Sequence, residues 1–179
     1  MNTKGVRKSI NLLEQISKGK IMENRSLSYV VEKLLNDPSI KEIINALKIE
    51  LQRSREPFVW RTVNIESMHD SLPKNIRSAW IFILRRETPS SAHYHPNSVQ
   101  YTTMIEGKGR AIIDGVNREL KPFDPTRDTE ALIVIGENIP HKFFPEKEDM
   151  VVISFHTCLD NELREIEVES KRQRIYRKE

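Results

Sequence analysis

The sequence predicts a mainly β protein, a sandwich or closed barrel of short antiparallel strands preceded by a helical segment. After Pro57, short apolar runs alternate with turn residues, and Asp114-Gly115 between two such runs is typical of a tight hairpin because both positions tolerate positive φ. Many short strands at even spacing favour a sandwich or a barrel. Before Pro57, apolar residues recur instead at helical spacing.

The helical segment is expected to span residues 1–56. Asn36-Asp37-Pro38 separates its last two helices, and Ser39 and Glu42 have the spacing of a capping box. Acidic and basic residues mix along the last helix, which is typical of a solvated face and argues against a DNA-binding helix-turn-helix. The apolar stripe of the same helix must be buried, so we expect the helices to pack on the barrel or to form a dimer. The three expected helices cover residues 10–17, 26–36 and 40–54.

The barrel is expected over residues 57–159. The charged residues 160–179 are expected to form a short helix followed by a loose tail. Eight strands are expected, over residues 58–65, 77–87, 99–106, 110–114, 118–121, 131–135, 142–144 and 150–157.

Composition excludes several classes of protein. The 179 residues include 29 Lys and Arg against 26 Asp and Glu, a surplus of +3, whereas nucleic-acid binders concentrate basic residues in a patch. No apolar run approaches the roughly 18 residues that cross a bilayer, and no secretion signal is recognisable. The single cysteine, Cys158, has no partner for an intrachain disulfide or a thiolate zinc site. We therefore expect a cytoplasmic protein with neither a nucleic-acid nor a membrane partner.

Three of the five histidines have a spacing that suits a metal ion. His93 and His95 lie two residues apart, and in an extended strand such residues point to the same face. Gln100 begins the next apolar run and offers an amide oxygen, and His141 follows a proline farther along the chain. These side chains form a candidate four-ligand set that leaves positions open for water, oxygen or substrate.

The stretch His93–Gly107 resembles the first motif of the cupin superfamily, G-x5-H-x-H-x3–4-E-x6-G. The histidine pair, the gap after it and the final glycine match, whereas Glu87 replaces the leading glycine and Gln100 replaces the acidic ligand. The second motif, G-x5-P-x-G-x2-H-x3-N, is matched at His141 alone. The resemblance covers the expected barrel and does not extend to the helices.

This resemblance implies a jelly-roll barrel with a divalent transition metal at one end, Fe(II) being favoured and Mn, Ni or Zn being alternatives. It also implies a homodimer and an Fe(II) dioxygenase-like reaction on a small organic acid or enolisable substrate. Two other functions stay open, because one fold hosts many chemistries. One is a non-redox isomerase, lyase or decarboxylase, and the other is a non-catalytic ligand-binding or regulatory cupin.

The glutamine at position 100 changes the charge of the candidate site. A carboxylate beside three neutral histidines would cancel one of the two charges of a divalent ion, whereas Gln100 cancels neither. The more positive site favours an anionic small-molecule ligand, and it also binds the metal less tightly. Gln100 is therefore expected to be a weak or exchangeable ligand.

Strand alternation extends the candidate site to further pocket residues. Positions two and four residues after Gln100 lie on the same face of their strand as Gln100. In the same way, the position two residues after His141 lies on the face of His141. His156 lies on the last long strand, where packing or surface exposure is favoured over a place in the pocket, and Arg85 ends a strand, where solvent exposure is favoured. The candidate pocket residues are Thr102, Met104, Phe143, Arg85 and His156.

Overall fold

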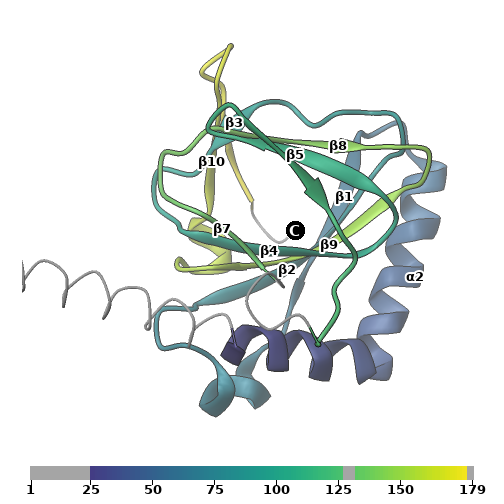
Figure 1. The fold of residues 1–179 in the computed structure, drawn as a ribbon, viewed down its shortest axis with the longest axis vertical. Helices are drawn as coiled ribbons and strands as arrows, with labels where there is room; N and C mark the ends of the chain where they lie inside the picture. The colour runs from purple at the N-terminus through teal and green to yellow at the C-terminus, as the bar shows by residue number, and fades with distance from the viewer. Residues whose placement is uncertain (1–24, 127–131, 177–179) are drawn as a thin grey trace, which may run out of the picture.

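The computed structural model describes residues 25–126 and 132–176, in which two antiparallel sheets face each other as a barrel with helices against its outside (Figure 1). One sheet has the strand order β1-β2-β9-β4-β7 and the other has the order β11-β10-β3-β8-β5-β6. The mainly β jelly roll with N-terminal helices that the sequence predicts is therefore confirmed.

The expected strands are all present, with ends that differ by at most three residues. Three further strands, β3, β10 and β11, were not expected. Short 3-10 helices cover Glu66–Ser71 and Asp160–Glu162. The strands are β1 (Phe58–Val63), β2 (Ser78–Leu84), β3 (His93–Tyr94), β4 (Gln100–Glu106), β5 (Gly109–Ile113), β6 (Val116–Leu120), β7 (Ile133–Ile135), β8 (His141–Pro145), β9 (Met150–His156), β10 (Arg164–Glu167) and β11 (Gln173–Ile175).

The C-terminal stretch differs from the helix and loose tail that were expected. After one short 3-10 turn, β10 and β11 form a hairpin, and β10 pairs with β3. Local charge suggested a solvated helix, but pairing with an exposed strand edge decided the conformation. The hairpin consequently lies against the part of the barrel that carries His93.

Helices over residues 25–36 and 38–53 confirm two of the three expected helices, and the one expected at 10–17 lies outside the described residues. The second of them is α2 (Pro38–Arg53). Asp37, rather than the Ser39–Glu42 box, caps it, because the Asp37 carboxylate accepts the Ser39 backbone N–H at 2.8 Å. Both helices bury their apolar stripes in one core cluster with the outer face of the five-stranded sheet. They therefore pack on the barrel.

Arg85 ties the end of α2 to the sheet. Its guanidinium donates hydrogen bonds to the backbone carbonyls of Leu51 at 2.7 Å, Ser54 at 2.9 Å and Glu56 at 3.0 Å. Cations at a helix C-terminus complement both the unpaired carbonyls and the helix dipole. Arg85 thus positions the helical layer on the sheet, and its guanidinium does not serve the mouth of the barrel.

Two glycines are required by the backbone. Gly107, the last residue of the first motif, has φ +90°, and a Cβ there would meet the Asp149 carbonyl oxygen at 2.3 Å. Asp114 and Gly115 have φ of 51° and 75° and connect β5 to β6, which confirms the predicted hairpin.

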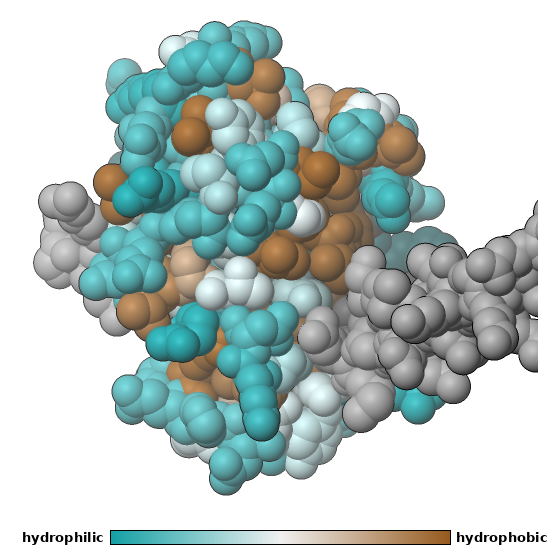
Figure 2. All heavy atoms as spheres, turned by 90° about the vertical axis from the view of Figure 1, so that its left-hand side faces the viewer, coloured by the Kyte–Doolittle hydropathy of each residue, from teal (hydrophilic) through white to brown (hydrophobic). Residues whose placement is uncertain are grey.

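Hydrophilic side chains cover most of the face drawn in Figure 2, with smaller apolar areas between them. Within the described part of the chain, no helix is long and apolar enough to cross a membrane.

Candidate metal centre

Three histidines converge at one end of the barrel. His93 opens β3, His95 follows that strand directly, and His141 opens β8. His93 and His141 are Cα partners in the β3–β8 pair. One ring nitrogen of each histidine lies within 4.8 Å of one from each of the others. The local i, i+2 alternation of a strand and one cross-strand pairing are enough to assemble this cluster.

Each of these rings is held by a backbone carbonyl. Nδ1 of His93 lies 2.9 Å from the Ser91 carbonyl oxygen, Nδ1 of His95 lies 2.8 Å from that of Arg164, and Nδ1 of His141 lies 3.0 Å from that of Ile139. Because a carbonyl only accepts, Nδ1 carries the proton in each ring and Nε2 keeps its lone pair. This is the tautomer that binds a metal through Nε2.

The environment also keeps these rings neutral. Burial lowers the pKa of His93 to about 3, with the neighbouring His95 as the second cause. Burial likewise lowers the pKa of His95, and lowers that of His141 well below its usual value. Nε2 of His141 is buried without a hydrogen-bond partner. Unpaired lone pairs gathered in a buried cluster are costly unless a cation shares them.

The amide of Gln100 is oriented by a chain of hydroxyl groups. Thr102 Oγ1 donates to the Ile153 carbonyl at 3.2 Å and lies 2.8 Å from Ser154 Oγ. Ser154 therefore donates to Thr102 and accepts the Gln100 Nε2–H at 3.2 Å. The Gln100 carbonyl oxygen is left buried without a hydrogen-bond partner. The side chain lies beside His95, where it partly opposes the lowering of the His95 pKa.

A fourth histidine, His156, faces the same space. Its Nδ1 lies 3.1 Å from Ser98 Oγ, which also accepts the Thr157 N–H and donates to the Val99 carbonyl. His156 Nδ1 therefore donates to Ser98, and its buried Nε2 has no hydrogen-bond partner. The His156 ring centroid is 5.3 Å from that of His95, and burial lowers its pKa well below the usual value.

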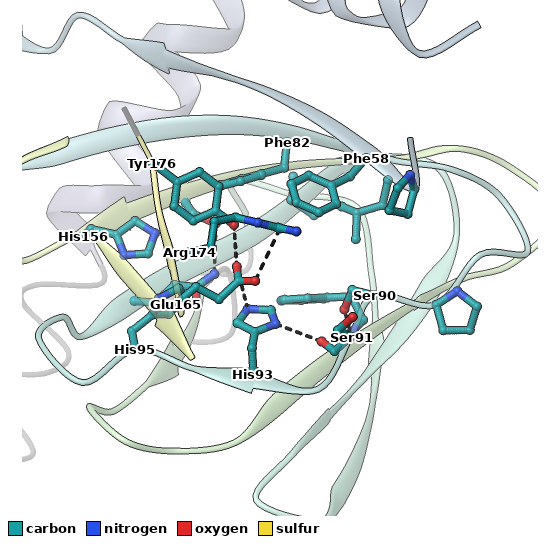
Figure 3. A pocket seen from close by; sticks show the side chains of 17 residues that line it. Phe58, Phe82, Ser90, Ser91, His93, His95, His156, Glu165, Arg174 and Tyr176 are labelled. Atoms are coloured by element: carbon teal, nitrogen blue, oxygen red, sulfur yellow. Dashed lines mark hydrogen bonds and ion pairs between the residues drawn. The ribbon is translucent and has the colours of Figure 1, made fainter. Parts of the chain in front are cut away.

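A cavity of about 110 Å³ opens beside the histidines (Figure 3). Its volume is close to that of a cavity that accepts benzene, roughly 150 Å³, so the cavity fits a small molecule. Aromatic and aliphatic side chains form its walls, and polar groups gather at one end. The apolar lining includes Phe58, Phe82, Leu84, Phe143 and Val152, and the polar lining includes His93, His95, Gln100, His156, Glu165 and Arg174.

The candidate pocket residues have different places in the structure. Phe143 and His156 line the cavity. Thr102 lies in the hydroxyl chain behind Gln100, and Met104 packs in a core cluster with Phe143. Arg85 is not at the cavity, because its guanidinium is engaged by the carbonyls at the end of α2.

Sequence reasoning missed the side chains that the C-terminal hairpin brings to the cavity. Glu165, Arg174 and Tyr176 lie on or next to β10 and β11 and line the space near His93 (Figure 3). Neither strand carries a clear local signal, because β10 does not alternate regularly between buried and exposed residues and all three residues of β11 are exposed. Their place depends on pairing with β3, which the sequence does not reveal locally.

No protein-family model matches the chain, and no curated protein matches it at a significant level. Among solved structures, the chain is similar to a salicylate 1,2-dioxygenase from Pseudaminobacter salicylatoxidans, with a TM-score of 0.51 and 13% identity over 65% of this chain and 33% of that one. It is also similar to KdgF from Halomonas sp., with a TM-score of 0.45 and 17% identity over 60% and 86% of the two chains. The cupin domain of Schizosaccharomyces pombe Cnp3 gives a TM-score of 0.44 at 7% identity over 57% and 65%.

These neighbours are cupin-fold proteins, and the chain has the cupin jelly roll with a histidine cluster that could hold a metal ion. At this identity the likeness establishes the fold alone. The chain spans about a third of the length of the dioxygenase.

Proposed function

We propose that the protein is a metal-dependent cupin enzyme that acts on a small organic acid or another enolisable, anionic molecule. An Fe(II) dioxygenase-like reaction is the favoured activity. The observation that carries this proposal is the set of three neutral, clustered histidines whose Nδ1 atoms are fixed by carbonyls, which leaves their Nε2 lone pairs free; His93 and His95 also line the cavity.

The donor set fits a divalent transition metal. Imidazole nitrogens suit Fe, Mn, Ni, Co and Zn, and the Gln100 carbonyl oxygen is a neutral fourth donor. In this proposal His93, His95 and His141 hold the ion, and Gln100 is a weak or exchangeable ligand. A bound ion would supply Lewis acidity and, if it is iron, electron transfer to dioxygen.

The remaining residues would bind and isolate the substrate. The apolar walls contributed by Phe58, Phe82 and Phe143 exclude water from the polar end of the cavity, which strengthens electrostatic attraction there. The three histidines and Gln100 cancel none of the charge of the ion, and Arg174 lies at the same cavity, so an anionic group is attracted. The small volume favours a compact acid.

Oxygen consumption tests the favoured activity directly. The protein would be loaded with Fe(II) under anaerobic conditions, mixed with air-saturated buffer, and supplied in turn with members of a panel of small keto, hydroxy and aromatic acids. We expect consumption that depends on one acid and is absent from His141→Ala. Turnover of an acid by zinc-loaded protein without oxygen would instead identify the non-redox alternative.

A non-catalytic cupin remains the second alternative. It is favoured by the glutamine at position 100, which weakens the metal site. It predicts that a small acid raises the melting temperature and is recovered unchanged. Size-exclusion chromatography with light scattering would test the homodimer, and fractionation of the source cells would test the cytoplasmic location; both belong to this proposal.

A further inference from the structure

Glu165 is the only Asp, Glu, Lys or Arg that is buried among residues 25–126 and 132–176, at 8% exposure. A buried carboxylate is costly unless it is paired with a cation or coordinates a metal. Glu165 lies next to His93, at the edge of the histidine cluster and outside the set of three ring nitrogens that lie within 4.8 Å of one another.

The protein groups around Glu165 compensate its charge only in part. Tyr176 donates its hydroxyl to Oε2, but a hydroxyl carries no charge. Arg174 Nη1 lies 3.4 Å from Oε1, longer than a good charged hydrogen bond of roughly 2.7–2.9 Å, and its side chain is 45% exposed. The remaining contact is with His93, whose Nε2 lies 3.7 Å from Oε2.

The contact with His93 lacks a proton. His93 Nδ1 donates to the Ser91 carbonyl, so the neutral ring turns a lone pair, not an N–H, toward the carboxylate. Two acceptors face each other, as Figure 3 shows, at the cavity side of the cluster. Two atoms bound to one ion at about 2.0–2.2 Å each lie roughly 3–4 Å apart, which the distance of 3.7 Å fits.

We propose that Glu165 supplies the carboxylate of the metal centre, from β10, in place of the acid that Gln100 does not provide on β4. The inference rests on the metal site proposed above and adds a protein charge to it. It also gives the C-terminal hairpin a role: β10 pairs with β3 in a register that sets Tyr94 opposite Ile166, and Glu165 lies 3.7 Å from His93. The acid of the site is thereby contributed by a different strand.

A purely structural role is the competing explanation. Glu165 accepts hydrogen bonds from Tyr176 and Arg174 and so fastens β11 to β10. Glu165→Gln separates the two roles, because the amide oxygen still accepts from Tyr176 while the charge is lost. Glu169→Gln is the matched control, because Glu169 is exposed in the turn between β10 and β11 and carries the same charge.

The test is the affinity of the full chain for Co²⁺, measured by calorimetry and by the visible absorption of the bound ion. We expect Glu165→Gln to weaken binding at least about tenfold, the effect typical of a charged partner of a metal site, and Glu169→Gln to change it less than about twofold. Adding Gln100→Glu to Glu165→Gln should restore the affinity, because the carboxylate returns to the site from β4. Circular dichroism and melting of the metal-free variants check that the hairpin stays folded.

The outcomes separate this inference from the proposed function. Wild-type affinity in Glu165→Gln, together with loss of Co²⁺ in His141→Ala, would overturn the role of Glu165 and leave the three-histidine site standing. Absence of stoichiometric Co²⁺ from the wild-type protein would overturn the metal site itself, and this inference with it.

Discussion

His93 and His141 face each other across the β3–β8 pair, with ring centroids 4.2 Å apart and both Nδ1 atoms bound to backbone carbonyls. The pairing links two residues that are far apart in the sequence and holds one ring nitrogen of each within 4.8 Å of the other, within the reach of one ion. Because the backbone fixes both rings, the site is organised before any ligand arrives.

Gln100→Glu should strengthen metal binding. The carboxylate would cancel one charge of a divalent ion. Ser154 Oγ, which accepts from the Gln100 amide, would have to turn its own hydroxyl proton from Thr102 to the new carboxylate. We expect Co²⁺ affinity to rise by about tenfold or more, the size of change seen when a charged partner is added to or removed from a metal site. Unchanged affinity in a competition titration with a chelator would show that position 100 is not at the ion.

The metal-free protein should lose stability as the pH falls below about 6.5. The pKa values of His93, His95, His141 and His156 are all lowered by burial, so the unfolded chain binds protons that the folded chain does not. Stability is therefore fully present above the unfolded pKa and is lost as the pH falls toward the folded values, which for His93 is about 3.

Each of these histidines contributes a loss of up to about 1.4 kcal/mol per pH unit. Urea unfolding at pH 7.5 and pH 5.5 measures the loss, and His156→Gln should make the dependence shallower. His69→Ala is the control, since the His69 side chain is 91% exposed. An unfolding midpoint that does not move with pH would contradict the burial of neutral rings.

Arg85→Ala should destabilise the fold by about 2 kcal/mol without altering metal content. Its guanidinium satisfies carbonyls at the end of α2, and hydrogen bonds from a charged group contribute about 1.5–3 kcal/mol. Chemical unfolding compared with Arg86→Ala, an exposed neighbour, isolates this effect. Loss of bound metal in folded Arg85→Ala protein would place Arg85 at the cavity after all.

Gly107→Ala should be more harmful than Gly115→Ala. Both residues have positive φ, which costs an L-residue about 1 kcal/mol or more, but only at position 107 would the new Cβ collide with a backbone carbonyl. The added clash predicts a further loss of about 1–3 kcal/mol, or failure to fold. Equal melting temperatures for the two variants would argue against this account of the motif glycine.

The histidine cluster could be predicted because its signals are local. His93 and His95 share a face through simple strand alternation, and His141 follows a turn that ends at Pro140. The same alternation explains why Phe143 and His156 reach the cavity. Apolar periodicity likewise predicted α2. Asp37 caps this helix in place of Ser39, because the Asp37 carboxylate lies next to the first free N–H groups of the helix.

The C-terminal hairpin could not be predicted because tertiary pairing decides its structure. Arg164–Glu167 is too charged to read as a strand, and it becomes one by completing the edge that the two-residue β3 leaves open. Glu165 was missed for the same reason. Arg85 was a candidate for the cavity because nothing in its own strand shows that the carbonyl groups at the end of α2 lie within reach of its side chain.

Metal analysis of the purified protein tests the central claim most directly. Wild-type protein, His93→Ala, His95→Ala, His141→Ala and the control His69→Ala would each be loaded with Fe(II) or Co²⁺, freed of excess ion and assayed for bound metal. The account predicts about one ion per chain in the wild type and the control, and a loss from each of the other three variants. Wild-type protein that retains no metal, or metal content that survives all three substitutions, would contradict it.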